Sequence, residues 1–209
     1  MHGDIRTRKA VIIGAGRVGS HVALCLMFQH LVNEIVFLDV NKEAARAQAL
    51  DLEDLASGLG DSFTIRVGEY ADCRDAHFVI LTAGRSRRPG ETRGTGTALD
   101  SARLRRVLSE TIDVSSRQIQ AFCMGEHGDS MFIPTSRISV EGINLREYLS
   151  LRDDVVDSID FGDVMRRVRE SGAAIISGKG CTEFGIASIV ADLVTSILHN
   201  EKRMLQEAV

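Results

Sequence analysis

The stretch Lys9-Ala-Val-Ile-Ile-Gly-Ala-Gly-Arg-Val-Gly19 decides the fold of this 209-residue chain. Its first half is an apolar run that predicts a buried strand, and residues 16–30 carry apolar side chains near helical spacing. The glycines have separate tasks: Gly14 permits a tight turn, Gly16 lets the backbone approach a pyrophosphate, and Gly19 lets the helix pack on the strand. The stretch therefore predicts a turn that places a pyrophosphate on the free N–H groups at the start of a helix.

An acidic residue stands at the distance from these glycines that a dinucleotide site requires. Asp39 follows Gly19 by twenty residues and ends a second apolar run, residues 34–39. A carboxylate in that place accepts hydrogen bonds from both ribose hydroxyls of NAD and repels the 2′-phosphate of NADP. Its alternative role is to cap the N-terminus of the next helix. The glycines, the strand before them and the acid together predict an NAD site.

Strands and helices alternate along the rest of the chain. Further strands are expected over 62–66, 77–82 and 118–124, and helices over 42–58, 98–112, 150–177 (interrupted near 161–162) and 182–200. Strands that are continuous apolar runs, alternating with helices, indicate a parallel sheet covered on both faces. We therefore expect an α/β protein.

The composition argues against several classes of function. The net charge of −4 disfavours nucleic acid or an anionic membrane as a partner. No apolar segment approaches the ~20 residues of a membrane span, and no signal peptide is visible. The cysteines are far apart and form no Cys-x-x-Cys pair, which argues against disulfides and a metal site. We therefore expect the protein to lie in a reducing compartment, the cytoplasm.

His127 is the candidate acid–base residue. It lies in Gly125-Glu-His-Gly-Asp129, where two glycines and two carboxylates predict a loop. An unperturbed imidazole titrates near pH ~6.5, so it can both accept and donate a proton in the cell. A surface turn without function is the alternative.

Asp100 and Arg103 share one face at the start of a predicted helix. The simpler interpretation is an intrahelical ion pair worth about a few tenths of a kcal/mol. In the functional interpretation, Asp100 orients a distant imidazole and stabilises its protonated form. Arg103 then holds a substrate carboxylate through two parallel hydrogen bonds.

Four segments carry a further signal. They are residues 83–93, residues 94–105 (Gly-Thr-Gly-Thr-Ala-Leu-Asp-Ser-Ala-Arg-Leu-Arg), residues 125–129 and residues 179–187 (Lys-Gly-Cys-Thr-Glu-Phe-Gly-Ile-Ala). Together and in this order they resemble the NAD-dependent L-lactate/malate dehydrogenase family, the first of them its mobile active-site loop. The resemblance implies an incomplete Rossmann-type doubly wound parallel sheet in residues 1–93 and a truncated α+β substrate domain in residues 94–209. It also implies hydride transfer between NAD and a small L-2-hydroxy acid.

The resemblance gives each charged residue a role. His127 is the proton donor and acceptor for the C2 oxygen of the substrate, and Asp100 raises its pKa. Arg103 binds the substrate carboxylate, Arg93 polarises the carbonyl when the loop closes, and Thr182 lines the pocket. The implied cofactor contacts are Gly14, Gly16, Arg17, Val18, Gly19, Asp39, Thr82, Ala83 and Gly84.

The choice of substrate stays open between two classes. In this family the position of Arg87 contacts the far end of the substrate, and Arg there suggests a second carboxylate, as in oxaloacetate. The residues Glu91 and Thr182 and the stretch 94–97 are more similar to the lactate and branched 2-hydroxy acid enzymes. Arg85 and Arg88 flank Arg87, so a shift of one residue in the loop changes which arginine enters the pocket.

The chain also departs from the family. Arg93 is followed at once by Gly94, where the family has on the order of fifty residues, and even a bare crossover between parallel strands needs at least ~10–12. A missing strand exposes a sheet edge, so we expect reduced stability and a tendency to associate. The family resemblance implies a homo-oligomer, a dimer or tetramer. A non-catalytic remnant that retains at most dinucleotide binding is the alternative function.

Overall fold

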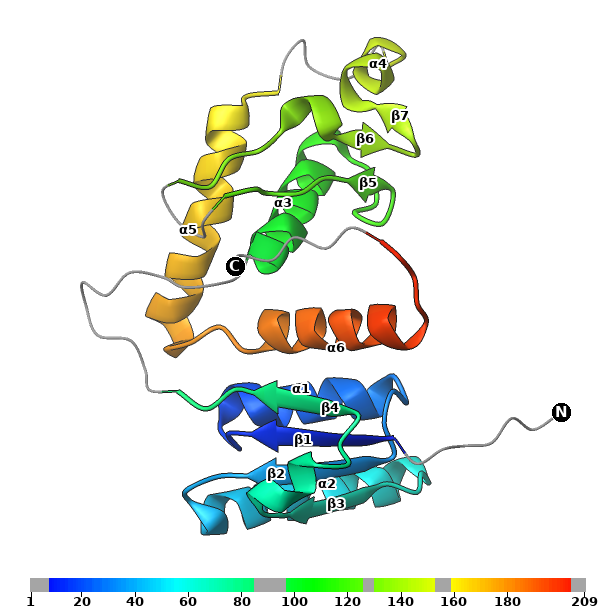
Figure 1. The fold of residues 1–209 in the computed structure, drawn as a ribbon. Helices are drawn as coiled ribbons and strands as arrows, with labels where there is room; N and C mark the ends of the chain where they lie inside the picture. Colours follow the sequence, from blue (N-terminus) through cyan, green and yellow to red (C-terminus); the bar gives the residue numbers. More distant parts are fainter. Residues whose placement is uncertain (1–7, 85–96, 126–129, 153–158, 204–209) are drawn as a thin grey trace, which may run out of the picture. The chain divides into compact units, whose positions relative to one another are not determined.

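The computed structural model describes residues 8–84, 97–125, 130–152 and 159–203 (Figure 1). Contacts divide them into two compact units. The first contains residues 8–84 together with Glu183–Arg203, and the second contains the described residues between 97 and 182. These units differ from the predicted domains, 1–93 and 94–209, because the last helix packs with the first unit.

The first unit is built on a four-stranded parallel sheet with the order β3-β2-β1-β4. Its strands are β1 Lys9–Ile13, β2 Glu34–Leu38, β3 Thr64–Val67 and β4 Phe78–Leu81. Ile13 lies beside Leu38 on one side and Leu81 on the other, so the carboxyl ends of β1, β2 and β4 meet at one edge. This topology confirms the predicted Rossmann-type sheet.

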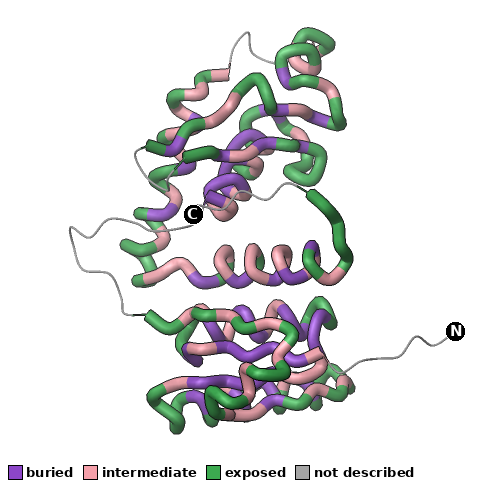
Figure 2. The backbone as a smooth tube through the Cα atoms, viewed as in Figure 1, coloured by how far each residue is buried: buried purple, intermediate pink, exposed green. Residues whose placement is uncertain are grey.

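Three helices of the first unit surround its main core. They are α1 Arg17–Phe28, α2 Lys42–Leu59 and α6 Phe184–Leu198. Ile12, Ile35 and Phe37 belong to this core and are fully buried. Figure 2 shows that the strands of this sheet are largely buried along β1 and β2. The helix α6 packs against α1, where the rings of Phe184 and His21 meet edge to face at 4.7 Å.

The opposite face of the sheet has a smaller core. Val11 and Val36 are buried there with Leu38. Val79 and Leu81 belong to the same face, since they pair with Val11 and Ile13, yet they are 50% and 71% exposed. The strand β4 is also the last strand on its side of the sheet. Among the described residues, this end of the sheet therefore keeps an apolar face and a strand edge accessible.

The second unit joins helices to a small antiparallel sheet of order β5-β6-β7. Its strands and helices are α3 Thr97–Ile112, β5 Ile119–Gln120, β6 Ser139–Val140, β7 Ile143–Asn144, α4 Leu145–Ser150 and α5 Phe161–Lys179. Leu104 and Leu108 on α3 and Val168 on α5 are fully buried in its core. This unit is mixed α and β, as predicted.

Two predicted elements of the second unit are wrong in their bounds. The strand expected over 118–124 is regular only over β5, because the chain then runs into an isolated bridge at Met124. The interruption expected near 161–162 is the beginning of α5: the Asp160 carboxylate accepts hydrogen bonds from the N–H groups of Gly162 and Asp163 and so caps that helix.

The chain has further short elements that the sequence did not predict. They are the 3-10 helices η1 Tyr70–Cys73 and η2 Thr135–Arg137, the strands β6 and β7, and α4. Across the described ranges, each helix is too short or too polar to cross a membrane.

Candidate functional site

The predicted glycine turn lies between β1 and α1, where the carboxyl ends of the strands meet. Gly14 has a φ of +106°, a conformation that residues with a side chain rarely adopt. A Cβ atom at Gly14 would lie 2.5 Å from the backbone nitrogen of Ala83, directly after β4. A Cβ at Gly19 would overlap the carbonyl oxygen of Gly14. Gly14 and Gly19 are therefore required for the turn to close against β4.

The start of α1 fits an anionic group. Its N-cap is Gly16, and among the described residues neither a capping side chain nor an acidic residue of the first turn neutralises its N–H groups. A Cβ at Gly16 would meet no described atom within 4 Å, so the backbone is approachable from outside. The first N–H groups of a helix carry a partial positive charge and bind phosphates. The donors present here fit the pyrophosphate of a dinucleotide.

Asp39 lies one residue beyond β2 and is held by two backbone groups. Its Oδ2 accepts a hydrogen bond from the Ala15 N–H at 2.7 Å, and its Oδ1 accepts one from the Asn41 N–H at 2.8 Å. The N-cap of α2 is Asn41, whose side chain accepts from the Ala44 N–H at 3.0 Å. The capping role considered for Asp39 is therefore wrong, and its carboxylate instead faces the glycine turn.

Thr82 approaches the same turn from β4. Its hydroxyl donates to the carbonyl oxygen of Gly14 at 2.8 Å and lies 3.3 Å from that of Ile13. The N–H of Ala83 donates to Ile13 at 2.8 Å. The structure thus gathers the predicted cofactor residues of the first unit, Gly14 to Gly19, Asp39 and the segment 82–84, around one turn.

Asp100 and Arg103 form a buried ion pair on the first turns of α3. The Arg103 guanidinium donates to the Asp100 carboxylate at 2.9 Å, and the two residues are 8% and 1% exposed. The pair is intrahelical, as the simpler interpretation held, but the magnitude expected for an exposed pair does not apply. Charged groups are rarely buried unless they are paired, and removing one partner then leaves a buried charge.

Hydrogen bonds tie α3 to the segment 121–123, which follows β5. The Ser101 hydroxyl donates to the Thr97 carbonyl at 2.8 Å and accepts from the Cys123 N–H at 2.9 Å. The Arg105 guanidinium donates to the carbonyl oxygen of Ala121 at 3.2 Å. These contacts hold residues 121–123 against the helix that carries Asp100 and Arg103.

Cys123 is buried in this region, and its thiol pKa reflects that burial. Burial, and then the negative charge of Asp100, raise the pKa of its thiol to about 12. The thiol is therefore neutral at physiological pH and acts as a small apolar side chain.

The described residues on the two sides of segment 126–129 are bridged to each other. Met124 and Phe132 form an antiparallel bridge with two N–H···O hydrogen bonds of 2.9 Å. Gly125 has a φ of +89°, which lets the chain turn out of this bridge. Residues 126–129, His127 among them, lie between these two anchors and outside the described residues.

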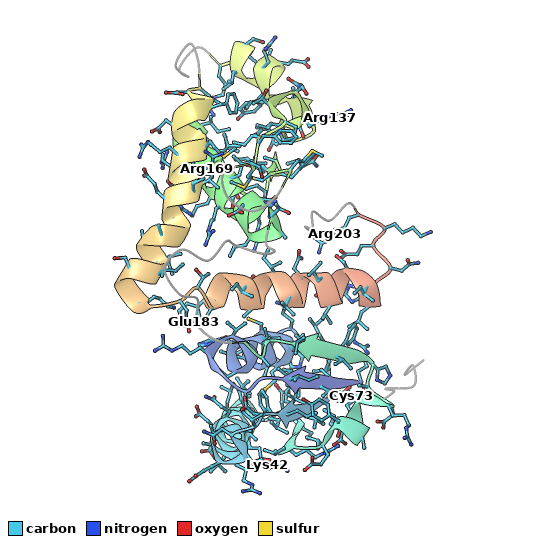
Figure 3. The ribbon with its side chains drawn as sticks, turned by 60° about the vertical axis from the view of Figure 1, so that its left-hand side comes forward. Lys42, Cys73, Arg137, Arg169, Glu183 and Arg203 are labelled. Atoms are coloured by element: carbon cyan, nitrogen blue, oxygen red, sulfur yellow. The ribbon has the colours of Figure 1, made fainter. Side chains whose placement is uncertain are left out.

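An arginine on α5 holds the described segment that follows residue 129. Arg169, labelled in Figure 3, donates from its guanidinium to the Met131 carbonyl at 3.0 Å. The sequence did not single out Ser101, Arg105 or Arg169, because their role depends on contacts between distant segments. For Ser101, its place between Asp100 and Arg103 on one helix was the available signal.

One of the remaining predicted site residues is described by the structure, and the others are not. Thr182 is half-buried and lies between α5 and α6. Arg87, Arg93 and His127 lie outside the described residues, and their roles stay predictions.

Relatives of the chain are longer by an internal segment. An L-lactate dehydrogenase of Fervidobacterium nodosum is 32% identical over 252 aligned positions, covering 94% of this chain and 81% of the relative. Because 94% of 209 residues is about 196, about 56 aligned positions of that relative have no counterpart here. The alignment confirms the predicted internal shortening; its place after Arg93 stays a prediction.

Two further proteins support the same relationship. An L-lactate dehydrogenase of Lactobacillus delbrueckii subsp. bulgaricus is 33% identical over 93% of this chain and 78% of the relative. The crystal structure of a minor L-lactate dehydrogenase from Enterococcus mundtii is similar with a TM-score of 0.88 and 29% identity, covering 97% of this chain and 81% of that one.

Family models match nearly the whole chain. The model of the lactate/malate dehydrogenase NAD-binding domain matches residues 8–119, and that of the lactate/malate dehydrogenase α/β C-terminal domain matches residues 97–209. With the glycine turn and the α1 N-terminus that fit its cofactor, the chain belongs to the lactate/malate dehydrogenase family of NAD-dependent oxidoreductases.

Proposed function

We propose that this chain transfers a hydride between NAD and a small L-2-hydroxy acid. The observation that supports this most is the buried Asp100–Arg103 pair on α3, the helix that also anchors residues 121–123, a few positions before His127. A carboxylate and a guanidinium kept dry in this way are the groups that an acid–base imidazole and an anionic substrate need. NAD, when bound, supplies the hydride chemistry.

The protein's own residues position the substrate and move its proton. His127 donates a proton to the carbonyl oxygen of the keto acid and takes it back in the reverse direction. Asp100 favours the protonated imidazole. Arg103 binds the substrate carboxylate, because a guanidinium has five N–H donors and the contact with Asp100 uses only part of them. Arg93 polarises the carbonyl, and Thr182 lines the pocket.

Two substrate classes remain to be separated. Arg87 supports a dicarboxylate such as oxaloacetate, since a second guanidinium would neutralise the second carboxylate. The named relatives are L-lactate dehydrogenases, which supports pyruvate and lactate. A paired assay of NADH oxidation with pyruvate and with oxaloacetate separates them. Arg87→Gln should lower the ratio of oxaloacetate to pyruvate kcat/KM if Arg87 contacts the substrate, and an unchanged ratio argues against that role.

A second candidate function is a non-catalytic remnant that binds the dinucleotide. Two observations favour it. The chain lacks about 56 aligned positions that the Fervidobacterium nodosum relative has, and the end of the sheet at β4 is uncovered among the described residues. NADH fluorescence titration beside the turnover assay distinguishes the candidates. Saturable binding with no oxidation by either keto acid supports the remnant, and oxidation that His127→Asn abolishes supports the dehydrogenase.

We propose that residues 1–93 bind the cofactor and that residues 94–209 bind the substrate, although α6 packs with the first unit.

The open edge of β4 supports a homo-oligomer, and light scattering after size-exclusion chromatography measures its size. The four cysteines are free thiols, which supports the cytoplasm as compartment. Fractionation of the source cells tests that assignment.

A further inference from the structure

A single peptide unit of the glycine turn is held at both ends by side chains. The carbonyl oxygen of Gly14 accepts a hydrogen bond from the Thr82 hydroxyl at 2.8 Å. The N–H of the next residue, Ala15, donates to the Asp39 carboxylate at 2.7 Å. These four residues lie within the first unit, and all of them are described.

The two side chains come from opposite neighbours of the central strand. Gly14 follows β1 directly, Asp39 follows β2 and Thr82 follows β4. Because β1 lies between β2 and β4 in the sheet, the peptide unit after β1 is held from both sides. We refer to Thr82, the Gly14–Ala15 peptide and Asp39 as the peptide clamp.

Gly19 makes room for the clamp. A Cβ atom on Gly19 would overlap the Gly14 carbonyl oxygen and approach the Thr82 hydroxyl oxygen to 2.8 Å. A side chain there would therefore displace the two atoms that form the hydrogen bond. The need for glycine at this position thus includes the space taken by the Thr82–Gly14 contact, in addition to close packing of helix on strand.

The clamp decides which N–H groups face the cofactor. The Ala15 N–H already donates a hydrogen bond to Asp39. The N–H groups that can bind the pyrophosphate are therefore those at the start of α1, where Gly16 is the N-cap. The same bonds fix the direction in which the chain leaves β1. Donors that are already oriented lose little freedom when an anion binds, which increases affinity.

We propose that Thr82 is a positioning residue for NAD, which acts through the Gly14–Ala15 peptide, in addition to any contact it makes with the cofactor. The proposal rests on the proposed function in one respect, that a dinucleotide binds at this turn. A role in stability alone predicts a different result: a variant that lacks the hydroxyl would melt at a lower temperature yet bind NADH normally once folded.

The test compares Thr82→Val, which replaces the hydroxyl with a methyl group, with Thr82→Ser, which retains the hydroxyl. Thr64→Val is the matched control, because Thr64 begins β3 in the same sheet. Loss of one hydrogen bond predicts that Thr82→Val weakens NADH binding about three- to tenfold in a fluorescence titration. We expect Thr82→Ser and Thr64→Val to stay within about twofold of the wild type.

Amide exchange of Ala15, measured by NMR without cofactor, tests the clamp separately. The Ala15 N–H should be protected in the wild type, and Thr82→Val should accelerate its exchange about three- to tenfold, because local opening becomes easier. If Thr82→Val does not fold, the wild-type measurement still decides, since an Ala15 amide that exchanges like an exposed amide overturns the clamp.

The remaining outcomes also separate the proposals. Faster exchange in Thr82→Val with unchanged NADH affinity overturns the positioning role. Unchanged exchange and unchanged affinity overturn the clamp as well. A wild-type chain that does not bind NADH, but whose Ala15 protection depends on Thr82, contradicts the dinucleotide function and supports the clamp.

Discussion

For Asp39 the structure adds the partners of the carboxylate to what the sequence predicts. Both of its carboxylate oxygens accept hydrogen bonds from backbone N–H groups, so its negative charge is fixed in place beside the glycine turn. A fixed carboxylate can accept from ribose hydroxyls only in one orientation, which is the condition for selecting NAD over NADP. The residue thus serves the turn and, in our proposal, the cofactor.

Replacing Asp39 tests this double role. Asp39→Ala should weaken NADH binding about tenfold or more, because it removes the ribose acceptor and leaves the Ala15 N–H without its partner. Fluorescence titration measures the effect. Asp51→Ala, on the exposed side of α2, is the control and should bind as the wild type does. An Asp39→Ala affinity equal to that of the control would refute the nucleotide site.

The buried Asp100–Arg103 pair makes a prediction about stability. Arg103→Leu should lower the free energy of unfolding by about 3–5 kcal/mol, because it removes a partner from a buried carboxylate. Arg106→Leu on the same helix breaks an exposed pair with Glu110 and should cost less than about 1 kcal/mol. Urea denaturation compares the two. Equal losses would show that burial of the Asp100–Arg103 pair has no energetic consequence.

The spacing of these residues was predictable from the sequence, but their burial was not. Asp100 and Arg103 stand three apart on a helix, which any helical projection shows. Their burial depends on which segments remote in sequence pack on α3, and these include α5 and residues 121–123. Likewise, the glycines and Asp39 were predicted, whereas the contact of Thr82 with Gly14 depends on the strand order that brings β4 beside β1.

At the scale of elements, the bounds of elements with long apolar patterns were predicted to within a few residues, and the short elements were not predicted. The strands β1 and β2 and the helix α2 have strong apolar patterns, and their observed bounds agree closely with the predicted ones. The two-residue strands β5, β6 and β7 have no periodicity to detect. The sequence predicts an interruption at the start of α5, where Gly162 follows Phe161, whereas the Asp160 N-cap is the decisive signal for a helix start.

A charge network joins β3, β2 and η1 and gives the fold a dependence on pH. Arg66 on β3 donates to Glu34 at 2.9 Å and to Asp72 at 2.6 Å. The Arg66 guanidinium, and next the Glu69 N–H, hold the pKa of Asp72 well below its usual range. Because this pKa is lower in the folded than in the unfolded chain, the stabilisation is present above about pH 4 and is lost as pH falls below it.

Removing the Asp72 carboxylate should make the free energy of unfolding depend less steeply on pH in the acid range. Asp72→Asn should reduce the free energy of unfolding near neutral pH and make it fall less steeply between about pH 4 and pH 2. Urea denaturation at a series of pH values measures both effects, with Asp51→Asn as the exposed control. A profile as steep as that of the wild type would mean that Asp72 does not contribute to the acid transition.

At the scale of the whole molecule, the chain lacks positions that a relative has, and one end of its sheet is uncovered among the described residues. About 56 aligned positions of the Fervidobacterium nodosum relative have no counterpart in this chain. Within the described residues, β4 ends the sheet with Val79 and Leu81 substantially exposed. An uncharged strand edge beside an apolar face favours pairing with another chain.

We therefore expect the chain to associate and to be less stable than an ordinary mesophilic domain. Light scattering at increasing protein concentration should show a rising mass, and Leu81→Lys should reduce it by placing a charge on the exposed face of β4. Leu59→Lys, on another exposed apolar residue at the end of α2, is the control. A monodisperse monomer with one reversible thermal transition at a typical mesophilic temperature contradicts both expectations.

The central proposal is that this shortened chain still turns over NAD with a 2-keto acid. The most direct measurement is the absorbance loss of NADH on addition of pyruvate or oxaloacetate to folded protein whose NADH binding has been titrated in the same preparation. We predict saturable NADH binding and keto-acid-dependent oxidation that His127→Asn abolishes. Saturable binding with no oxidation by either keto acid would contradict it.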